Sequence, residues 1–437
     1  MKEKKRLTNE EVLNRRNYKR PNPIIYGLYK LIGTPFISMP LNRHLKRNVK
    51  VSDCKGPCFL VYNHQSRIDH QLFMEAAWPK RVSILAGYSE FFRSHLHTVF
   101  KLNGILPKKM YTTDIVSLKA MKKIVKLNGC IAFSPEGTSS MFGYNQPVVP
   151  ATGHFLKHYG IPVYFLHIQG AYLTQNKVDN SFRKGRIETE LSLLFTPDDL
   201  KRLTDEEIND KLNEAFRHDD YLWNQERHIE FKPKKGNSMT QNLSDILYRC
   251  PKCDTLFTMK DSNDEIYCTK CGNRAKLDHF YDFHPTEGSI VYNPSRWSIW
   301  EREELIKDIR KDPNYSFEVN CKLGFLPEYG YIKNHKTSII EGEGKFIVDH
   351  SGVHFRGTRL NEPYNFDMTY KEIYTLCIMT DFKQFVTYVK GVYHEFIPEF
   401  DCAGYLTQLI EEMHRLHENT FKNFKWNEYM YELDNNK

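Results

Sequence analysis

Residues 58–69, CFLVYNHQSRID, combine an apolar run with the polar residues that follow it. The run at 58–62 is typical of a buried strand, and His64 and Asp69 come after its end, where α/β folds place their chemistry. On one continuous helix the two residues would lie about 140° apart, so they can meet only if a helix begins between them. Ser66 is the predicted N-cap, which places Asp69 at N3.

This arrangement predicts a catalytic pair. The helix N-terminus is expected to keep the carboxylate of Asp69 ionised, and Asp69 can then fix one tautomer of the imidazole. The other ring nitrogen of His64 is free to take a proton from a hydroxyl, which typically contributes about 10²–10⁴-fold in rate.

Other apolar runs alternate with helical patterns along residues 46–235. The sequence predicts further strands at 82–86, 130–133, 161–168 and 187–195 and a helix at 115–126. Thr204 and Glu207 form a capping box that opens a last helix. This order predicts an α/β domain with a mixed, largely parallel sheet.

The strand at 130–133 is followed by a second polar motif, SPEGTSS at 134–140. Gly137 lets the backbone approach a ligand closely, and exposed N–H groups can hold a phosphate or an oxyanion. Glu136 can accept hydrogen bonds from hydroxyls or orient a basic partner.

The two motifs resemble those of the glycerophospholipid acyltransferase family: NHQSRID is similar to its NHxxxxD signature and SPEGTSS to its FPEGTRS block. Residues 104–109 (GILPKK) fall where the family has a glycine and a phosphate-binding arginine, and 161–163 at its proline-containing block. The resemblance covers roughly residues 24–235. It implies that His64, oriented by Asp69, deprotonates an acceptor hydroxyl that attacks an acyl thioester of coenzyme A or acyl carrier protein.

The same resemblance implies that the acceptor is a lysophospholipid, chiefly 1-acyl-sn-glycerol 3-phosphate, in phospholipid biosynthesis. The residues it assigns to acceptor binding are Lys108, Lys109, Glu136, Gly137 and Thr138. Two departures leave other acceptors open. Ser139 stands where the family has an arginine, and the lysines of GILPKK bind phosphate without the bidentate fork of arginine.

Four cysteines form a separate motif, C-x2-C-x14-C-x2-C. Its members are Cys250, Cys253, Cys268 and Cys271. Four thiolates on two knuckles predict a structural zinc ion with no open coordination position; iron in a rubredoxin-like site is the alternative. Basic residues of this ribbon are offset by acidic ones, so a nucleic-acid partner is not favoured.

The sequence predicts four segments: a basic, membrane-interfacial segment at 1–45, the acyltransferase domain at 46–235, the zinc ribbon at 243–285 and a β-rich domain with a terminal helix at 290–430. Residues 232–242 are the predicted linker. In the last segment we expect strands at 338–347, 352–355, 373–379, 385–389 and 394–397 in a small barrel or sandwich. Asp401 is the predicted N-cap of the terminal helix.

Composition fits a folded protein, with 40% apolar and 14% aromatic residues in 437 and a net charge of +8. No secretory signal peptide is visible, and the apolar stretch 24–41 is too interrupted to span a bilayer. We expect this stretch to lie at the membrane interface with Tyr26, Tyr29 and Phe36 at headgroup level, while the basic residues before it attract anionic lipids. A core helix at the edge of the domain is the alternative. The cysteine usage favours a reducing compartment, so the predicted location is the cytoplasmic face of the membrane.

Two other functions remain open. One is a non-catalytic membrane adaptor that uses the acyltransferase fold and the ribbon for interactions, although the retained His64 and Asp69 argue against it. The other is a nucleic-acid-binding protein that uses the ribbon, which a steep salt dependence of binding would reveal.

Overall fold

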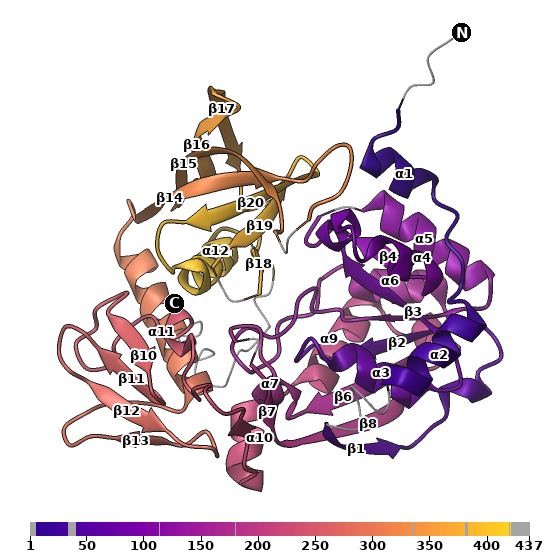
Figure 1. Ribbon diagram of the computed structural model, residues 1–437, viewed down its shortest axis with the longest axis horizontal. Coiled ribbons are helices and arrows are strands. Elements are labelled where there is room, and N and C mark those ends of the chain that lie inside the picture. Colours follow the sequence, from indigo (N-terminus) through magenta and orange to yellow (C-terminus); the bar gives the residue numbers. More distant parts are fainter. Residues whose placement is uncertain are drawn as a thin grey trace.

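The computed structural model describes residues 6–33, 41–112, 114–179, 181–333, 336–380, 383–418 and 420. An α/β domain, a small four-stranded ribbon and a β-rich domain with a final helix follow one another along the chain (Figure 1). This order confirms the predicted fold class.

The α/β domain is built on a seven-stranded sheet with the order β1-β8-β6-β2-β5-β3-β4. Neighbouring strands are parallel except β6 and β8, which are antiparallel. The strands are β1 (Asn42–Arg47), β2 (Cys58–Tyr62), β3 (Val82–Gly87), β4 (Leu106–Lys108), β5 (Cys130–Phe133), β6 (Val163–Gln169) and β8 (Arg186–Phe195). The central strands β2 and β5 are fully buried, as expected for a sheet covered on both faces.

Helices cover the two faces of this sheet. They are α2 (Pro23–Gly33), α3 (Asp69–Ala77), α4 (His97–Leu102), α5 (Ile115–Lys126), α6 (Thr152–Tyr159), α7 (Ala171–Thr174), α8 (Pro197–Arg202), α9 (Asp205–Phe216) and α10 (Asp220–Arg227). Alternate residues of β2 point to opposite faces: Leu60 packs in the cluster that includes α3, whereas Phe59 packs in the one that includes α5 and α9. The predicted capping box of α9 is present.

The ribbon forms an antiparallel sheet of β10 (Met259–Ser262), β11 (Glu265–Cys268), β12 (Arg274–Leu277) and β13 (Phe283–Pro285). The segment before it is not a plain exposed linker. Lys232–Pro233 (β9) pairs with Arg183–Lys184 (β7), and Met239 and Thr240 are buried.

The β-rich domain begins with a helix that the sequence did not predict, α11 (Pro294–Lys311). Its seven strands are antiparallel in the order β17-β16-β15-β14-β20-β19-β18, followed by α12 (Ala403–His417). They are β14 (Ser316–Phe325), β15 (Ile339–Asp349), β16 (Gly352–Arg359), β17 (Glu362–Met368), β18 (Cys377–Ile378), β19 (Phe385–Val389) and β20 (Val392–Pro398). Strands β14 and β17 were missed, and the strand expected at 373–379 is reduced to β18.

The predicted N-cap of the last helix is also wrong. Cys402 is the residue before α12, and Asp401 instead pairs with Lys383 at 2.8 Å.

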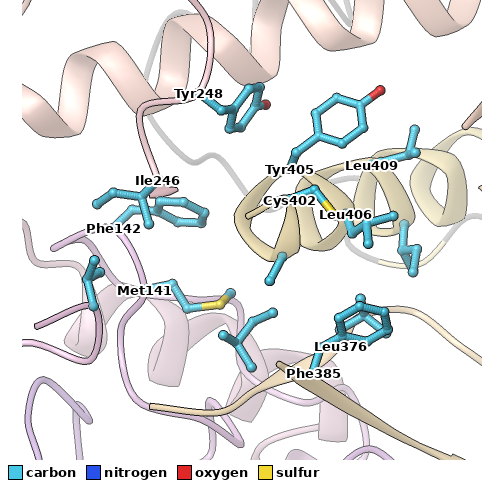
Figure 2. Packing of buried hydrophobic residues seen from close by; sticks show 14 of the residues in the cluster. Met141, Phe142, Ile246, Tyr248, Leu376, Phe385, Cys402, Tyr405, Leu406 and Leu409 are labelled. Atoms are coloured by element: carbon cyan, nitrogen blue, oxygen red, sulfur yellow. The ribbon is translucent and has the colours of Figure 1, made fainter. Parts of the chain in front are cut away.

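One hydrophobic core joins all three parts of the chain. Figure 2 shows Met141 and Phe142 of the α/β domain, Tyr248 before the ribbon and Leu406 of α12 in the same cluster. A hydrogen bond also crosses this region: the hydroxyl of Tyr144 lies 3.2 Å from that of Ser298 on α11. The segment that follows the SPEGTSS motif is therefore held by the ribbon and the β-rich domain.

The N-terminal segment is packed rather than free where it is described. Helix α1 (Asn9–Arg15) buries Leu13, and the backbone N–H of Asn9 donates to the carbonyl of Glu328 at 2.8 Å. Within the described ranges, none of the helices has the length and apolar character needed to cross a membrane.

Helix α2 corrects the expected orientation of the aromatic residues at 24–41. Tyr26 does not face outward: it is 2% exposed and stacks on Trp78. Tyr29 is only partly buried and is hydrogen-bonded to Gln71. Phe36 lies outside the described residues.

Candidate active site and metal centre

The carboxyl ends of parallel strands bring the predicted site residues to one edge of the sheet. His64 follows β2, Glu136 follows β5, and Lys108 ends β4. Strands β2 and β5 are neighbours, so the NHQSRID and SPEGTSS motifs lie side by side there, whereas β4 is the outer strand of the sheet.

His64 and Asp69 form the predicted pair. Nδ1 of His64 lies 2.8 Å from Oδ2 of Asp69, which also accepts hydrogen bonds from the backbone N–H groups of Gln65 at 2.8 Å and Ser66 at 3.0 Å. Because Oδ2 receives three donors, Nδ1 carries the ring hydrogen and Nε2 is left as the basic nitrogen. The side chain of His64 keeps 29% of its surface exposed, whereas that of Asp69 keeps 1%.

The helix that follows His64 starts later in the chain than predicted. Helix α3 begins at Asp69 with Ile68 before it, so Ser66 is not its N-cap. The hydroxyl of Ser66 instead donates to the carbonyl of Gln175 at 2.5 Å. The carboxylate of Asp69 closes a turn back onto the chain, and this turn, rather than a serine cap, brings it to His64.

The expected electrostatics of Asp69 also need correction. Burial raises the pKa of Asp69, although the hydrogen bonds from His64 and from the N–H groups of Ser66 and Gln65 act to lower it. Desolvation of the carboxylate thus outweighs these hydrogen bonds.

Glu136, a predicted substrate-binding residue, holds the backbone of His64. Its Oε2 accepts the N–H of His64 at 2.7 Å, and its Oε1 accepts the N–H of Gln146 at 2.8 Å. On the other side, the N–H of Ser140 donates to the carbonyl of His64 at 2.6 Å. The SPEGTSS loop therefore holds His64 through its main chain, and Glu136 is a positioning residue.

Glu136→Gln is expected to lower the free energy of unfolding at pH 5 by about 1–3 kcal/mol, since the amide NH₂ leaves a buried N–H donor unpaired. Burial raises the pKa of Glu136 from 4.5 to about 8. The wild type therefore loses stability as pH rises from about 4.5 to about 8, while glutamine does not titrate. In thermal melts, the stability difference between the wild type and the variant should be smaller at pH 8 than at pH 5. A deficit that is constant with pH would contradict this account.

Gly137 and Thr138 complete the loop. Gly137 has a φ of +79°, and a Cβ there would lie 2.8 Å from the ring of Tyr111. The ring of Tyr111 in turn packs edge-on against that of Tyr374 in the β-rich domain, with 5.1 Å between the ring centroids. The hydroxyl of Thr138 is buried and accepts a hydrogen bond from Nζ of Lys177 at 2.7 Å.

The two lysines of GILPKK differ in their surroundings. Nζ of Lys109 is already engaged: it lies 3.0 Å from Oε1 of Glu10 and 3.0 Å from the carbonyl of Gly391. This structure does not show Lys109 open to a phosphate, because α1 and the β-rich domain occupy it. Lys108 is partly buried, and burial lowers its pKa.

Sequence reasoning missed several contributors to the site, among them the backbone amides of Gln146 and Ser140 and the ring of Tyr111. A backbone N–H is common to every non-proline residue, so no side-chain pattern could have revealed these bonds.

The four cysteines of the ribbon form a compact sulfur cluster. Their Sγ atoms all lie within 4.8 Å of one another, with 3.6 Å between Cys250 and Cys271 and 3.7 Å between Cys253 and Cys268. A tetrahedral ion with bonds of about 2.3 Å requires sulfur atoms about 3.8 Å apart. The donor set therefore fits zinc, and the predicted ligands are brought together.

Comparisons with known proteins bear on the α/β domain. Residues 41–168 match the family model described as Acyltransferase. Among solved structures, the 1-acyl-sn-glycerophosphate (LPA) acyltransferase PlsC from Thermotoga maritima is similar with 16% identity and a TM-score of 0.37, over 44% of this chain and 76% of that chain. None of the curated proteins searched matches the chain significantly. The matched range includes both motifs at the sheet edge.

Proposed function

We propose that the chain, whose residues 41–168 match the family model described as Acyltransferase, moves a fatty acyl group from acyl-CoA or acyl carrier protein to a lysophospholipid hydroxyl. The proposed acceptor is 1-acyl-sn-glycerol 3-phosphate, in phospholipid biosynthesis. The observation that carries the proposal is the 2.8 Å contact between His64 and Asp69 beside the SPEGTSS loop. A non-catalytic adaptor would have no need of this pair.

In the proposed reaction, Nε2 of His64 takes the proton of the acceptor hydroxyl as its oxygen attacks the thioester carbonyl. Asp69 holds Nδ1–H and stabilises the imidazolium that forms. When the tetrahedral intermediate collapses, the carbon–sulfur bond breaks, and the thiolate takes the proton from His64. The products are the ester and the free thiol, and the histidine returns to its first state.

A product screen with the purified protein tests this proposal. Acyl-CoA and acyl carrier protein donors are offered in parallel with a panel of lysophospholipids, and new esters are identified by mass spectrometry. We expect ester from lysophosphatidic acid that depends on His64. No ester from any acceptor, with the protein folded, would favour the adaptor.

An exposed apolar stripe on α2 supports docking to a membrane surface. Ile24 is 70% exposed, Leu28 48%, Leu31 71% and Ile32 59%. These positions share one face of the helix, opposite the buried Tyr26. In the proposed arrangement this stripe enters the interface of the cytoplasmic leaflet, and nearby basic residues attract anionic lipids.

Replacing Leu28 and Leu31 together by Glu is expected to weaken vesicle binding at least tenfold. Moving each leucine side chain out of water contributes roughly 1.5–3 kcal/mol to the free energy of binding. Co-sedimentation with phosphatidylglycerol vesicles measures the effect. Leu360 and Val392 are the matched control, being 67% and 51% exposed on the β-rich domain. If glutamates at the control positions weakened binding equally, the stripe would not be the docking surface.

For the sulfur cluster we propose a structural zinc ion held by Cys250, Cys253, Cys268 and Cys271. All four donors are thiolates, so the ion would fold the ribbon and take no part in acyl transfer.

A further inference from the structure

Lys177 is a buried lysine beside the SPEGTSS motif. The residue is only 8% exposed, and its Nζ donates to the hydroxyl of Thr138 at 2.7 Å. Among the residues that the structure describes, no carboxylate lies within ion-pair distance of it; Asp179, two residues on, is paired with Arg183 at 2.6 Å. Burying an ammonium group without a counter-charge is costly, so an anion from outside would stabilise it.

The position of Lys177 links it to the catalytic loops. Thr138 lies between Glu136 and Ser140, whose groups hold the N–H and the carbonyl of His64. Two residues before Lys177, the carbonyl of Gln175 accepts a hydrogen bond from the hydroxyl of Ser66. The ammonium group thus binds the SPEGTSS motif directly, and the backbone two residues before it binds the NHQSRID motif.

In the part of the chain that the structure describes, the groups that influence the charge of Lys177 include no carboxylate. Burial lowers the pKa of Lys177, Cys377 of β18 opposes this shift, and the positive charge of Arg67 adds to it. The thiol of Cys377 is itself buried, and burial raises its pKa, so it stays neutral and does not compensate the lysine.

Unpaired polar groups on the same loops also point to a polar ligand. Gln65 is fully buried and Gln146 is 3% exposed, yet neither atom of the Gln65 amide and not Nε2 of Gln146 has a hydrogen-bond partner among the described residues. Buried amides without partners are rare in folded proteins.

We propose that Lys177 binds the phosphate of the acyl acceptor, as an anion subsite beside Thr138. This deepens the proposed function and rests on it for the identity of the ligand. Position 139, where the resembling family has its arginine, is serine here, and Lys109 is engaged by Glu10. Lys177 supplies the missing positive charge from a segment outside the recognised motifs.

Equilibrium binding of sn-glycerol 3-phosphate to the full chain, without acyl donor, tests the subsite independently of turnover. Lys177→Met is expected to weaken binding at least tenfold, and Lys177→Arg to restore most of it. Lys80→Met is the control, since Lys80 is partly buried and its Nζ donates to the carbonyl of Gly56 at 2.8 Å, outside both motifs, and it should change binding less than threefold. Lys177→Gln keeps a hydrogen-bonding side chain and replaces the methionine variant if that one fails to fold.

Kinetics separate the acceptor from the donor. With lysophosphatidic acid, Lys177→Met should raise the KM for the acceptor while kcat and the KM for acyl-CoA change little. Unchanged glycerol phosphate binding in Lys177→Met and Lys177→Gln, equal losses in the Lys80 and Lys177 variants, or a rise in the donor KM alone would each overturn the proposal. Binding that depends on Lys177 in a protein without acyl transfer would support the subsite and refute the proposed reaction.

Discussion

A His64→Ala protein is expected to keep its fold and lose acyl transfer by about 10²–10⁴-fold in kcat, the usual contribution of a positioned base. The fold should survive because the structural contacts of this residue come from its main chain, which Glu136 and Ser140 hold and which alanine retains. The imidazole itself is partly exposed and contributes one hydrogen bond, to Asp69.

The measurement is initial-rate acyl transfer, with melting temperatures recorded alongside. His154→Ala is the matched control: its Nδ1 lies 3.0 Å from Oδ2 of Asp205, a second histidine–carboxylate pair on the surface. The control should be as active as the wild type. A His64→Ala protein with wild-type turnover would refute the assigned chemistry.

Loss of the metal is expected to have the other large effect. Cys271→Ser should remove bound zinc and lower the melting temperature strongly, since structural zinc contributes on the order of 10 kcal/mol to a ribbon, against a net stability of about 5–15 kcal/mol for a typical domain. Cys54→Ser is the control, because Cys54 is also partly exposed but lies outside the sulfur cluster. Metal content is measured by mass spectrometry.

Cys271→Ser should also impair acyl transfer, although the ribbon contributes no catalytic group. The core of the ribbon is continuous with Met141 and Phe142, which directly follow Ser140, and Ser140 holds the carbonyl of His64. A Cys271→Ser protein that lacks zinc but keeps wild-type stability and activity would show that the ribbon is independent of the site.

Elements with strong local signals could be predicted from the sequence. The all-apolar strand β2, the capping box of α9 and the cysteine spacing each encode their structure within a few residues. Helix α11 could not be found this way, because its buried face includes Glu301 and Arg302. Arg302 is paired with Glu411 at 2.7 Å and Glu412 at 2.8 Å, about 110 residues away, so its burial depends on a distant helix rather than on apolar periodicity.

The sequence predicted the contact between His64 and Asp69, but not the residues that hold His64 in place. His64 and Asp69 are close in sequence, and their spacing with the following helix restricted how they could meet. Glu136 lies 72 residues from His64 and reaches its backbone, which no residue pattern reveals. The engagement of Lys109 by Glu10 depends on how α1 packs, again a long-range result.

The shared core has a consequence for how the protein is made. Residues Met141 and Phe142 pack with Leu406 of α12 (Figure 2), some 260 positions later in synthesis. While the ribosome is still translating the β-rich domain, the newly made catalytic half lacks its partner surface and exposes these apolar side chains. We therefore expect the α/β domain to complete its core only after α12 has been synthesised, and the exposed apolar side chains to favour aggregation until then.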